Sequence, residues 1–160
     1  MHFERMTPTW VSPSSLRGHQ VFVGRRDGMT EAVTSGGELI LRLPLPAKAA
    51  RERLLAWGLD PSAGKLPAVK GILAAGTDFQ HRVWKACTGI GEGETLTYGQ
   101  LAARIGCRSA QAVGQALGAN PLAKVIPCHR VKGADGAGGF AWGTRRKAAW
   151  LREESHGLAG

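Results

Sequence analysis

A stretch rich in glycine, proline and alanine, residues 58–76, divides the chain into two parts whose apolar residues are spaced differently. Before this stretch, short apolar pieces alternate with turn residues, which is the pattern of strands joined by hairpins. After it, apolar residues recur every three or four positions, which is the pattern of helices. We therefore predict an α+β protein with two domains: residues 1–76, a sheet with one helix and a linker, and residues 77–160, a mainly helical domain.

The first part has the pattern of a small antiparallel sheet followed by a single helix. Its apolar pieces lie at 10–11, 20–23, 32–33 and 39–43, and glycines separate the last three. Pro44 and Pro46 end this pattern, because proline cannot donate to a strand ladder. Residues 47–57 then place apolar side chains on one face of a helix that ends at Gly58. This part shows no residue pattern typical of catalysis.

Three helix starts in the second part are indicated by capping residues. Thr77 and Thr97 each stand three residues before a glutamine, the spacing of a capping box, and Ser109 precedes a third helix. Cys87 falls on the apolar face of the first helix, where cysteine packs as a small hydrophobic residue. The second and third helices, joined by residues 106–108, form a helix-turn-helix. Such hairpins also occur in proteins that do not bind DNA.

The third of these helices has an unusual face opposite its core. The apolar stripe consists of Ala112, Val113, Ala116 and Leu117, which leaves Gln111, Gly114, Gln115 and Gly118 on the other side. An ordinary solvated face would carry lysine and glutamate. Small, uncharged residues instead allow a helix backbone to approach another surface closely. This face therefore favours a DNA-binding role for the helix-turn-helix.

The chain is basic throughout, with a formal net charge of +9. Residues 1–76 carry ten Lys and Arg against six Asp and Glu, and residues 77–160 carry eleven against six. A basic protein favours polyanionic partners, of which nucleic acid is the commonest. Charge alone would fit a solvated surface equally well. The helix-turn-helix, with the slim face of its second helix, favours DNA as the partner, and a solvated basic surface stays the alternative.

Residues 120–131, Asn-Pro-Leu-Ala-Lys-Val-Ile-Pro-Cys-His-Arg-Val, place a thiol, an imidazole and a guanidinium side by side. A thiolate is a strong nucleophile, and a neighbouring base and positive charge favour it; His129 and Arg130 are suitable groups. Pro127 fixes the backbone before Cys128. One alternative is an inert core cysteine. Another is a zinc ligand, but adjacent Cys and His lack the spacing of zinc sites, so we expect no metal.

Residues 93–154 resemble the active-site domain of the O6-alkylguanine-DNA alkyltransferases, whose acceptor cysteine lies in a Pro-Cys-His-Arg-Val motif. The resemblance rests on that motif at 127–131, on Asn120-Pro121 and on Thr97-Tyr98-Gly99. It implies a protein that binds double-stranded DNA through the minor groove and flips out an O6-alkylguanine. The alkyl group would pass irreversibly to the cysteine, so that each protein molecule would be consumed by one reaction. No cofactor is implied.

The resemblance also implies roles for particular residues. Cys128 would accept the alkyl group, and His129 would take the thiol proton through a water. Glu154 would orient the imidazole. Asn120 would be the hinge between the recognition helix and the active site.

Further residues would serve the base and the DNA. Tyr98 would press on the phosphate beside the target and help to protonate the leaving guanine, assisted by Lys147. The base would be held by Val131, Gly139, Phe140, Ala141 and Trp142. The DNA contacts would come from Tyr98, Arg108, Gln111, Gly114 and Gln115. The chain departs from the family at Gln111, where an intercalating arginine is usual, and at Phe140, where tyrosine is usual.

Three other functions were weighed against alkyl transfer. An alkyltransferase-like lesion sensor binds alkylguanine without removing the alkyl group, but such proteins replace the cysteine that this chain keeps. A helix-turn-helix regulator with Cys128 as a redox switch would ordinarily be a dimer with a charged recognition helix. A cysteine hydrolase would need an oxyanion hole and turnover.

The location of the protein is indicated by its cysteines and its lack of apolar segments. Cys87, Cys107 and Cys128 are odd in number and form no Cys-x-x-Cys pair, which favours a reducing compartment. No apolar run reaches the roughly 18–20 residues that span a membrane, and the first residues lack the apolar region of a signal peptide. We expect a cytoplasmic monomer without membrane association.

Overall fold

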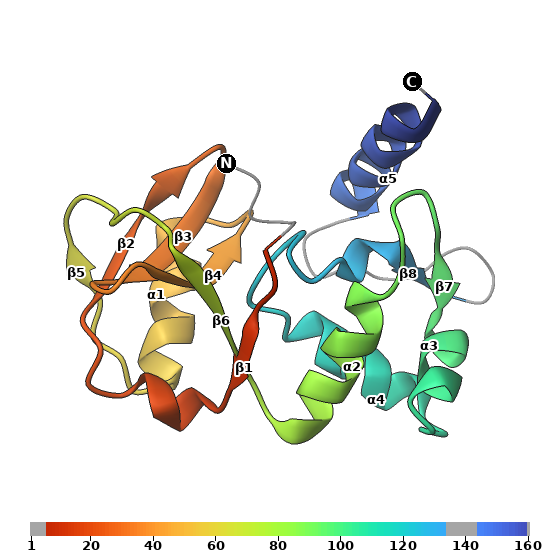
Figure 1. The fold of residues 1–160 in the computed structure, drawn as a ribbon, viewed down its shortest axis with the longest axis horizontal. Helices are drawn as coiled ribbons and strands as arrows, with labels where there is room; N and C mark the ends of the chain where they lie inside the picture. The colour runs from red at the N-terminus through yellow and green to blue at the C-terminus, as the bar shows by residue number, and fades with distance from the viewer. Residues whose placement is uncertain (1–5, 134–143, 160) are drawn as a thin grey trace. The chain divides into compact units, whose positions relative to one another are not determined.

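The computed structural model describes residues 6–133 and 144–159. The chain forms two compact units: unit 1 comprises Met1–Thr77 and Pro121–Ala123, and unit 2 comprises Asp78–Asn120 and Lys124–Gly160. Unit 1 contains a sheet and unit 2 is mainly helical, so the predicted α+β class is confirmed (Figure 1). Within the described ranges, no helix combines the length and the apolar character needed to cross a membrane.

Unit 1 is built on a six-stranded mixed sheet with the strand order β1-β6-β4-β3-β2-β5. The strands are β1 Thr9–Val11, β2 Val21–Arg26, β3 Met29–Thr34, β4 Glu38–Leu43, β5 Ser62–Ala63 and β6 Gly71–Ala75. A 3-10 turn, η2, covers Pro13–Leu16. β2, β3 and β4 form the predicted antiparallel hairpins. The other pairings are parallel, β6 with both β1 and β4, and β5 with β2, so the prediction of a purely antiparallel sheet is wrong.

The predicted linker, residues 58–76, supplies two of these strands and is therefore not a linker. Its glycine and alanine content has little preference for strands, which concealed β6 in the sequence. Ile72 and Ala74 are nevertheless buried, because β6 lies in the sheet between β1 and β4. A parallel pairing between distant segments leaves no local pattern.

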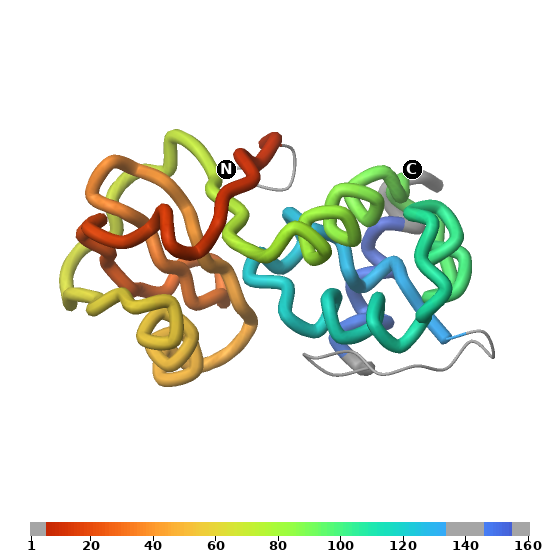
Figure 2. Tube along the Cα trace, turned by 90° about the horizontal axis from the view of Figure 1, so that it is seen from below, coloured from red at the N-terminus to blue at the C-terminus, as the bar shows by residue number. Residues whose placement is uncertain are grey.

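The helix of unit 1, α1 Ala47–Ala56, packs against the sheet over β2 and β3 (Figure 2). Its range agrees with the prediction to within one residue, and Gly58 follows with a φ of 80°, the left-handed conformation that ends many helices. Ala50 and Leu54 are buried on its inner face. Leu39, the first buried residue of β4, is also completely buried.

Three residues from the second half of the chain pair with the sheet of unit 1. The backbone N–H of Arg42 in β4 donates to the Pro121 carbonyl, and the N–H of Ala123 donates to the Arg42 carbonyl, each at 2.8 Å. Leu122 between them is completely buried. The Arg42 side chain is also buried and lies 3.3 Å from the Glu31 carboxylate. The chain thus enters unit 1 immediately after Asn120.

In its described residues, unit 2 contains four α-helices and a two-stranded parallel sheet. The elements are α2 Asp78–Thr88, β7 Leu96–Thr97, α3 Tyr98–Arg104, α4 Ala110–Gly118, the 3-10 turn η3 Cys128–Arg130, β8 Val131–Lys132 and α5 Thr144–Ala159. α2, α3 and α4 pack on one another. The indole N–H of Trp84 in α2 donates to the Ala116 carbonyl of α4 at 2.8 Å in the core. Cys87 is fully buried, as predicted.

The predicted helix-turn-helix is formed by α3 and α4. Gln100 N donates to the Thr97 hydroxyl at 3.0 Å and Thr97 N donates to the Gln100 side chain at 2.9 Å, which confirms the capping box. The Ser109 hydroxyl accepts from Ala112 N at 3.0 Å and so begins α4. Gly106 makes the turn with a φ of 68°.

Candidate active site

Cys128 opens a tight turn that immediately follows Pro127. Cys128 N donates to the Ile126 carbonyl at 2.8 Å, and Arg130 N donates to the Pro127 carbonyl at 3.0 Å, which closes the 3-10 turn η3. Val131 then pairs with Leu96 in the parallel β7–β8 ladder. The cysteine is only 5% exposed. Backbone hydrogen bonds on both sides therefore hold the candidate nucleophile in one place.

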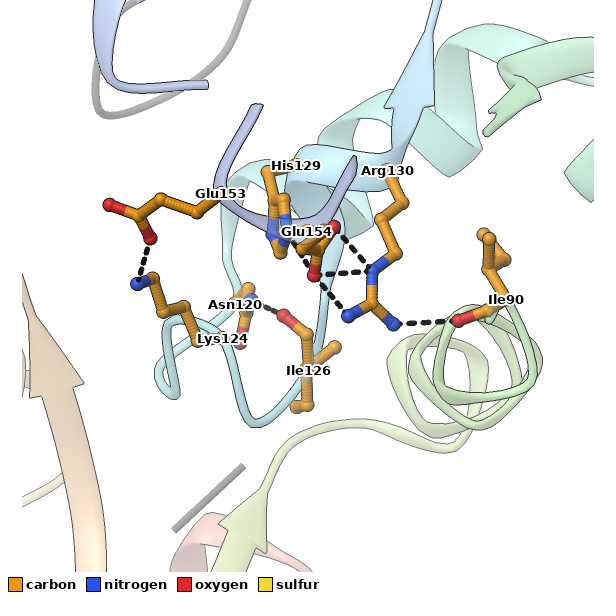
Figure 3. Close-up of polar contacts among 8 residues, drawn as sticks. All are labelled: Ile90, Asn120, Lys124, Ile126, His129, Arg130, Glu153 and Glu154. Atoms are coloured by element: carbon orange, nitrogen blue, oxygen red, sulfur yellow. Dashed lines mark hydrogen bonds and ion pairs between the residues drawn. The ribbon is translucent and has the colours of Figure 1, made fainter. Parts of the chain in front are cut away.

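Asn120 is the residue that contacts the thiol directly. Its Nδ2 donates to the Ile126 carbonyl at 2.9 Å and to Sγ of Cys128 at 3.2 Å, and the side chain is fully buried. Figure 3 shows Asn120 pointing toward the Ile126 carbonyl. An N–H donor aimed at sulfur stabilises a thiolate more than a thiol. This contact was not predicted, because eight residues separate Asn120 from Cys128.

The thiol of Cys128 is protonated in this environment. Burial raises its pKa to about 12, although the Asn120 amide and the positive charge of Lys147 act in the opposite direction. Lys147 is itself buried, and its Nζ donates to the Val131 carbonyl at 2.5 Å. Burial lowers the pKa of Lys147. A nucleophilic reaction at Cys128 therefore has to move the thiol proton to a base.

His129 is the base nearest to Cys128 in the chain, and it is 1% exposed. Its Nε2 lies 3.2 Å from Oε2 of Glu154 in α5, and among the described residues neither ring nitrogen has another hydrogen-bond partner. Burial lowers the pKa of His129, and the Glu154 carboxylate offsets part of that effect. The imidazole is therefore neutral at neutral pH and is able to accept a proton.

Glu154 lies between His129 and Arg130, as Figure 3 shows. Arg130 Nε donates to the two carboxylate oxygens at 3.1 and 3.0 Å, its Nη2 also donates to Oε2, and its Nη1 donates to the Ile90 carbonyl at 2.7 Å. Burial alone would raise the pKa of Glu154, but the hydrogen bonds from Arg130 and the contact with His129 bring it below its usual value. Glu154 is therefore a carboxylate at neutral pH.

The side chain of Arg130 does not serve the thiol in the way that its position beside Cys128 suggested. Its guanidinium is bound to Glu154 and to the Ile90 carbonyl. The cation whose charge lowers the pKa of Cys128 is Lys147, 19 positions further along the chain.

The remaining predicted residues occupy different parts of unit 2. Tyr98 is half-buried at the start of α3, and burial followed by the charge of Cys128 raises its pKa. Val131 is fully buried beside η3. Arg108, Gln111 and Gln115 are exposed on the helix-turn-helix, and Gly114 is half-exposed. Gly139, Phe140, Ala141 and Trp142 lie outside the described residues.

Two further residues line the site and were missed in the sequence. The ring of Trp150 in α5 stands edge-on to His129, with the centroids 5.3 Å apart and an interplanar angle of 84°. Lys124 Nζ lies 4.9 Å from the centroid of the Trp150 ring. Trp150 precedes Glu154 by four residues, and this helical spacing could have placed it beside His129. Lys124 lies in a loop, where no periodic signal exists.

Comparison with known proteins places this site in a known family. The family model described as 6-O-methylguanine DNA methyltransferase, DNA binding domain, matches residues 78–156, which include every residue placed in this site. A crystal structure of Mycobacterium tuberculosis OGT in complex with DNA superposes with a TM-score of 0.65 and 35% identity, covering 86% of this chain and 93% of that chain. The chain belongs to the O6-methylguanine-DNA methyltransferase family. The predicted resemblance is thereby confirmed.

Curated members of the O6-methylguanine-DNA methyltransferase family match shorter segments. The methylated-DNA–protein-cysteine methyltransferase of Mycobacterium tuberculosis is 53% identical over 81 residues, which are 49% of this chain and 49% of that protein. Its counterpart from Salmonella typhimurium is 46% identical over 101 residues, 61% of this chain and 59% of that protein. The matches therefore span about half the length of these curated relatives.

Proposed function

We propose that this protein repairs DNA by transferring the alkyl group of O6-alkylguanine to Cys128, once per protein molecule. The observation that carries the proposal is the arrangement around Cys128: a buried thiol held by Asn120, with the neutral His129 beside it and Glu154 on the far side of the imidazole. This arrangement lies inside the segment that matches the family. The relatives named above are methylated-DNA–protein-cysteine methyltransferases.

The reaction begins with a proton transfer, because the thiol is neutral at rest. In our proposal the proton passes from Sγ of Cys128 through a water to Nδ1 of His129, whose other nitrogen faces Glu154. The negative carboxylate of Glu154 stabilises the imidazolium that forms. Asn120 and Lys147 stabilise the thiolate.

The thiolate then attacks the alkyl carbon. A sulfur–carbon bond forms, the bond from that carbon to O6 breaks, and its electron pair passes to the guanine. The guanine gains one proton, which Tyr98 and Lys147 help to deliver. One proton has therefore left the thiol and one has reached the guanine, so the reaction is balanced. The product is a thioether, which no group in the site hydrolyses, and each protein molecule therefore acts once.

The damaged base must leave the helix to reach a thiol that is 5% exposed. We assign the contact with DNA to α4, whose exposed face carries Gln111 and Gln115 with Gly114 between them. A helix with so little side chain on one face suits the narrow minor groove, which is about 6 Å wide. Arg108 and Tyr98 would contact the backbone. Val131 would bound the base pocket, together with residues 138–142, which lie outside the described residues.

The proposal is tested by counting lesions against protein molecules. Increasing amounts of protein are incubated with a fixed amount of duplex containing one O6-methylguanine, and the remaining lesion is measured after the DNA is digested to nucleosides. We expect the lesion to decline linearly and to vanish at one equivalent of protein. Cys128→Ala should bind the duplex and remove nothing. Binding without loss of the lesion would favour a lesion sensor, and loss beyond one equivalent would favour a hydrolase; either result would overturn the proposal.

A further inference from the structure

Trp150 contacts the imidazole of His129, and Lys124 contacts Trp150 in turn. Trp150 is 7% exposed and meets the imidazole edge-on, with 5.3 Å between the ring centroids. Lys124 Nζ lies 4.9 Å from the centroid of the indole ring and 3.4 Å from Oε2 of Glu153. Ammonium, indole and imidazole therefore follow one another in contact.

The backbone conformation of Lys124 indicates that its side chain has a function. Its φ is 68°, in the left-handed region that residues other than glycine, asparagine and aspartate rarely adopt. A glycine would occupy this position without strain. Strained backbone is commonly retained where the side chain has a function. At Lys124 the observed contacts of the side chain are those with Trp150 and Glu153.

We infer that Trp150 and Lys124 are positioning residues for the proposed alkyl transfer: the indole shields the imidazole of His129 from water, and the ammonium beyond it opposes protonation of His129. The imidazole consequently stays neutral until it receives the proton of Cys128. The role of these two residues in catalysis rests on the proposed function. The ionisation of His129, however, can be measured without any alkyl transfer.

The charges around His129 agree with this assignment. Among the ionisable groups of the elements packed around it, the charges that act on His129 are those of Glu154 in α5, Arg130 in η3 and Lys124. Burial lowers the pKa of His129 most, Glu154 raises it, and Arg130 and Lys124 lower it. Arg130 is already paired with Glu154. Lys124 is therefore the cation through which the pKa of His129 can be changed without breaking the Glu154 contact.

The test measures the pKa of His129 by NMR titration of the histidine ring protons. The chain has five histidines, and the spectrum of His129→Gln identifies the resonance. Lys124→Gly fits the positive φ and removes the charge, and Lys124→Met removes the charge alone. We expect both variants to raise the pKa of His129, and Trp150→Ala to raise it because water then reaches the ring. Trp150→Phe keeps an aromatic ring and should stay near the parent value.

The same variants predict a change in the pH dependence of transfer. A raised pKa means that His129 is already protonated at mildly acidic pH, where it cannot accept the thiol proton. With free O6-benzylguanine as substrate, we expect the transfer rate of Lys124→Gly at pH 6 to be roughly threefold lower than the rate of the same variant at pH 8. Lys85→Met, which removes an exposed lysine of α2, is the matched control and should leave the profile unchanged.

The outcomes separate this inference from the proposed function. An unchanged pKa of His129 in Lys124→Gly and Lys124→Met would overturn the role of Lys124, and an unchanged value in Trp150→Ala would overturn that of Trp150. If Trp150→Ala does not fold, the lysine variants and Trp150→Phe decide. A parent protein that does not transfer alkyl groups, but whose His129 titrates as expected in all variants, would refute the function and leave the tuning of His129 in place.

Discussion

At the residue scale, the Cys128 thiol is subject to two opposing influences. Burial holds the proton on sulfur and raises the pKa to about 12, whereas the Asn120 amide and the Lys147 ammonium favour the thiolate. A thiol with this pKa is inert toward dissolved electrophiles at neutral pH. In the proposed reaction it becomes a nucleophile when an alkyl group is brought against it and His129 takes the proton. Burial would then protect a residue that, under this proposal, reacts only once.

The role of Glu154 gives a prediction at the same scale. Glu154→Gln removes the charge that faces His129 and Arg130, so the imidazolium formed during transfer loses its stabilising partner. We expect the single-turnover rate on an O6-methylguanine duplex to fall by about a hundredfold. Glu92→Gln, an exposed carboxylate of unit 2, should keep the parent rate. Equal rates for Glu154→Gln and the parent, with both folded by thermal melting, would refute the role.

The sequence predicted the chemistry of single residues better than their surroundings. Cys128 and His129 were identified from residue type and from the Pro-Cys-His-Arg-Val motif. Arg130 was placed beside the thiol because it is near in sequence. Successive residues of a 3-10 turn point about 120° apart, so neighbours in η3 face different surroundings. The contacts of Asn120 and Trp150 depend on how distant segments pack.

At the scale of elements, α4 has a surface that the fold of the protein does not explain. A Cβ added at Gly114 or at Gly118 would meet no atom within 4 Å, so no contact with the described part of the chain requires glycine at either position. Glycine in a helix is less stable than alanine by about 1 kcal/mol. A surface that sacrifices helix stability for small size is typical of close approach to a partner, which in our proposal is the floor of the DNA groove.

Gly114→Ala separates the effect of that surface on protein stability from its effect on DNA binding. We expect the free energy of unfolding to rise by about 1 kcal/mol, because alanine favours the helix and fits the open space. The affinity for duplex DNA should fall, because the methyl group keeps α4 from the groove. Chemical denaturation and fluorescence anisotropy with a labelled duplex measure the two effects. A stabilised variant with unchanged DNA affinity would exclude this face of α4 as the contact surface.

Gln111 gives a second prediction for α4. The family usually carries an arginine at this position that fills the gap left by the flipped base, and a glutamine lacks its charge and its flat stacking surface. We expect Gln111→Arg to raise the rate of transfer from duplex DNA while leaving the reaction with free O6-benzylguanine nearly unchanged. Equal duplex rates for the parent, Gln111→Arg and Gln111→Ala would show that another residue, such as Arg108 or Gln115, fills the gap.

The starts of helices were predicted from local capping signals, whereas the strand β6 was not predicted. The capping box at Thr97 and the cap at Ser109 fixed the starts of α3 and α4, because capping depends on residues three positions apart. β6 was taken for part of a linker, since its strand partners, β1 and β4, are far away in sequence.

At the scale of the whole molecule, a short segment of the second half of the chain belongs to unit 1. The chain leaves unit 2 at Asn120, contributes Pro121–Ala123 to unit 1 and returns at Lys124. The hydrogen bonds of Arg42 with Pro121 and Ala123 fix this crossing. Within unit 1, residues 121–123 are therefore held against β4 by backbone hydrogen bonds. The sequence could not indicate this, because a three-residue bridge has no periodicity.

Leu122 tests the importance of the crossing for stability. It is fully buried in unit 1, so Leu122→Ala should lower the free energy of unfolding by about 2–5 kcal/mol through lost burial and the cavity left behind. Leu55→Ala is the matched control: Leu55 is 59% exposed, and its removal should change stability by less than about 0.5 kcal/mol. Urea denaturation compares the two. Equal losses in both variants would refute an anchoring role for residues 121–123.

Transfer to Cys128 is tested most directly by the mass of the protein after reaction. The protein is incubated with an excess of duplex containing O6-methylguanine, and its intact mass and the masses of its peptides are measured. We expect a gain of about 14 Da, one methylene, on the peptide that contains Cys128, at no more than one per protein molecule and absent from Cys128→Ala. An unchanged protein mass, or a methyl group on Cys87 or Cys107 instead, would contradict it.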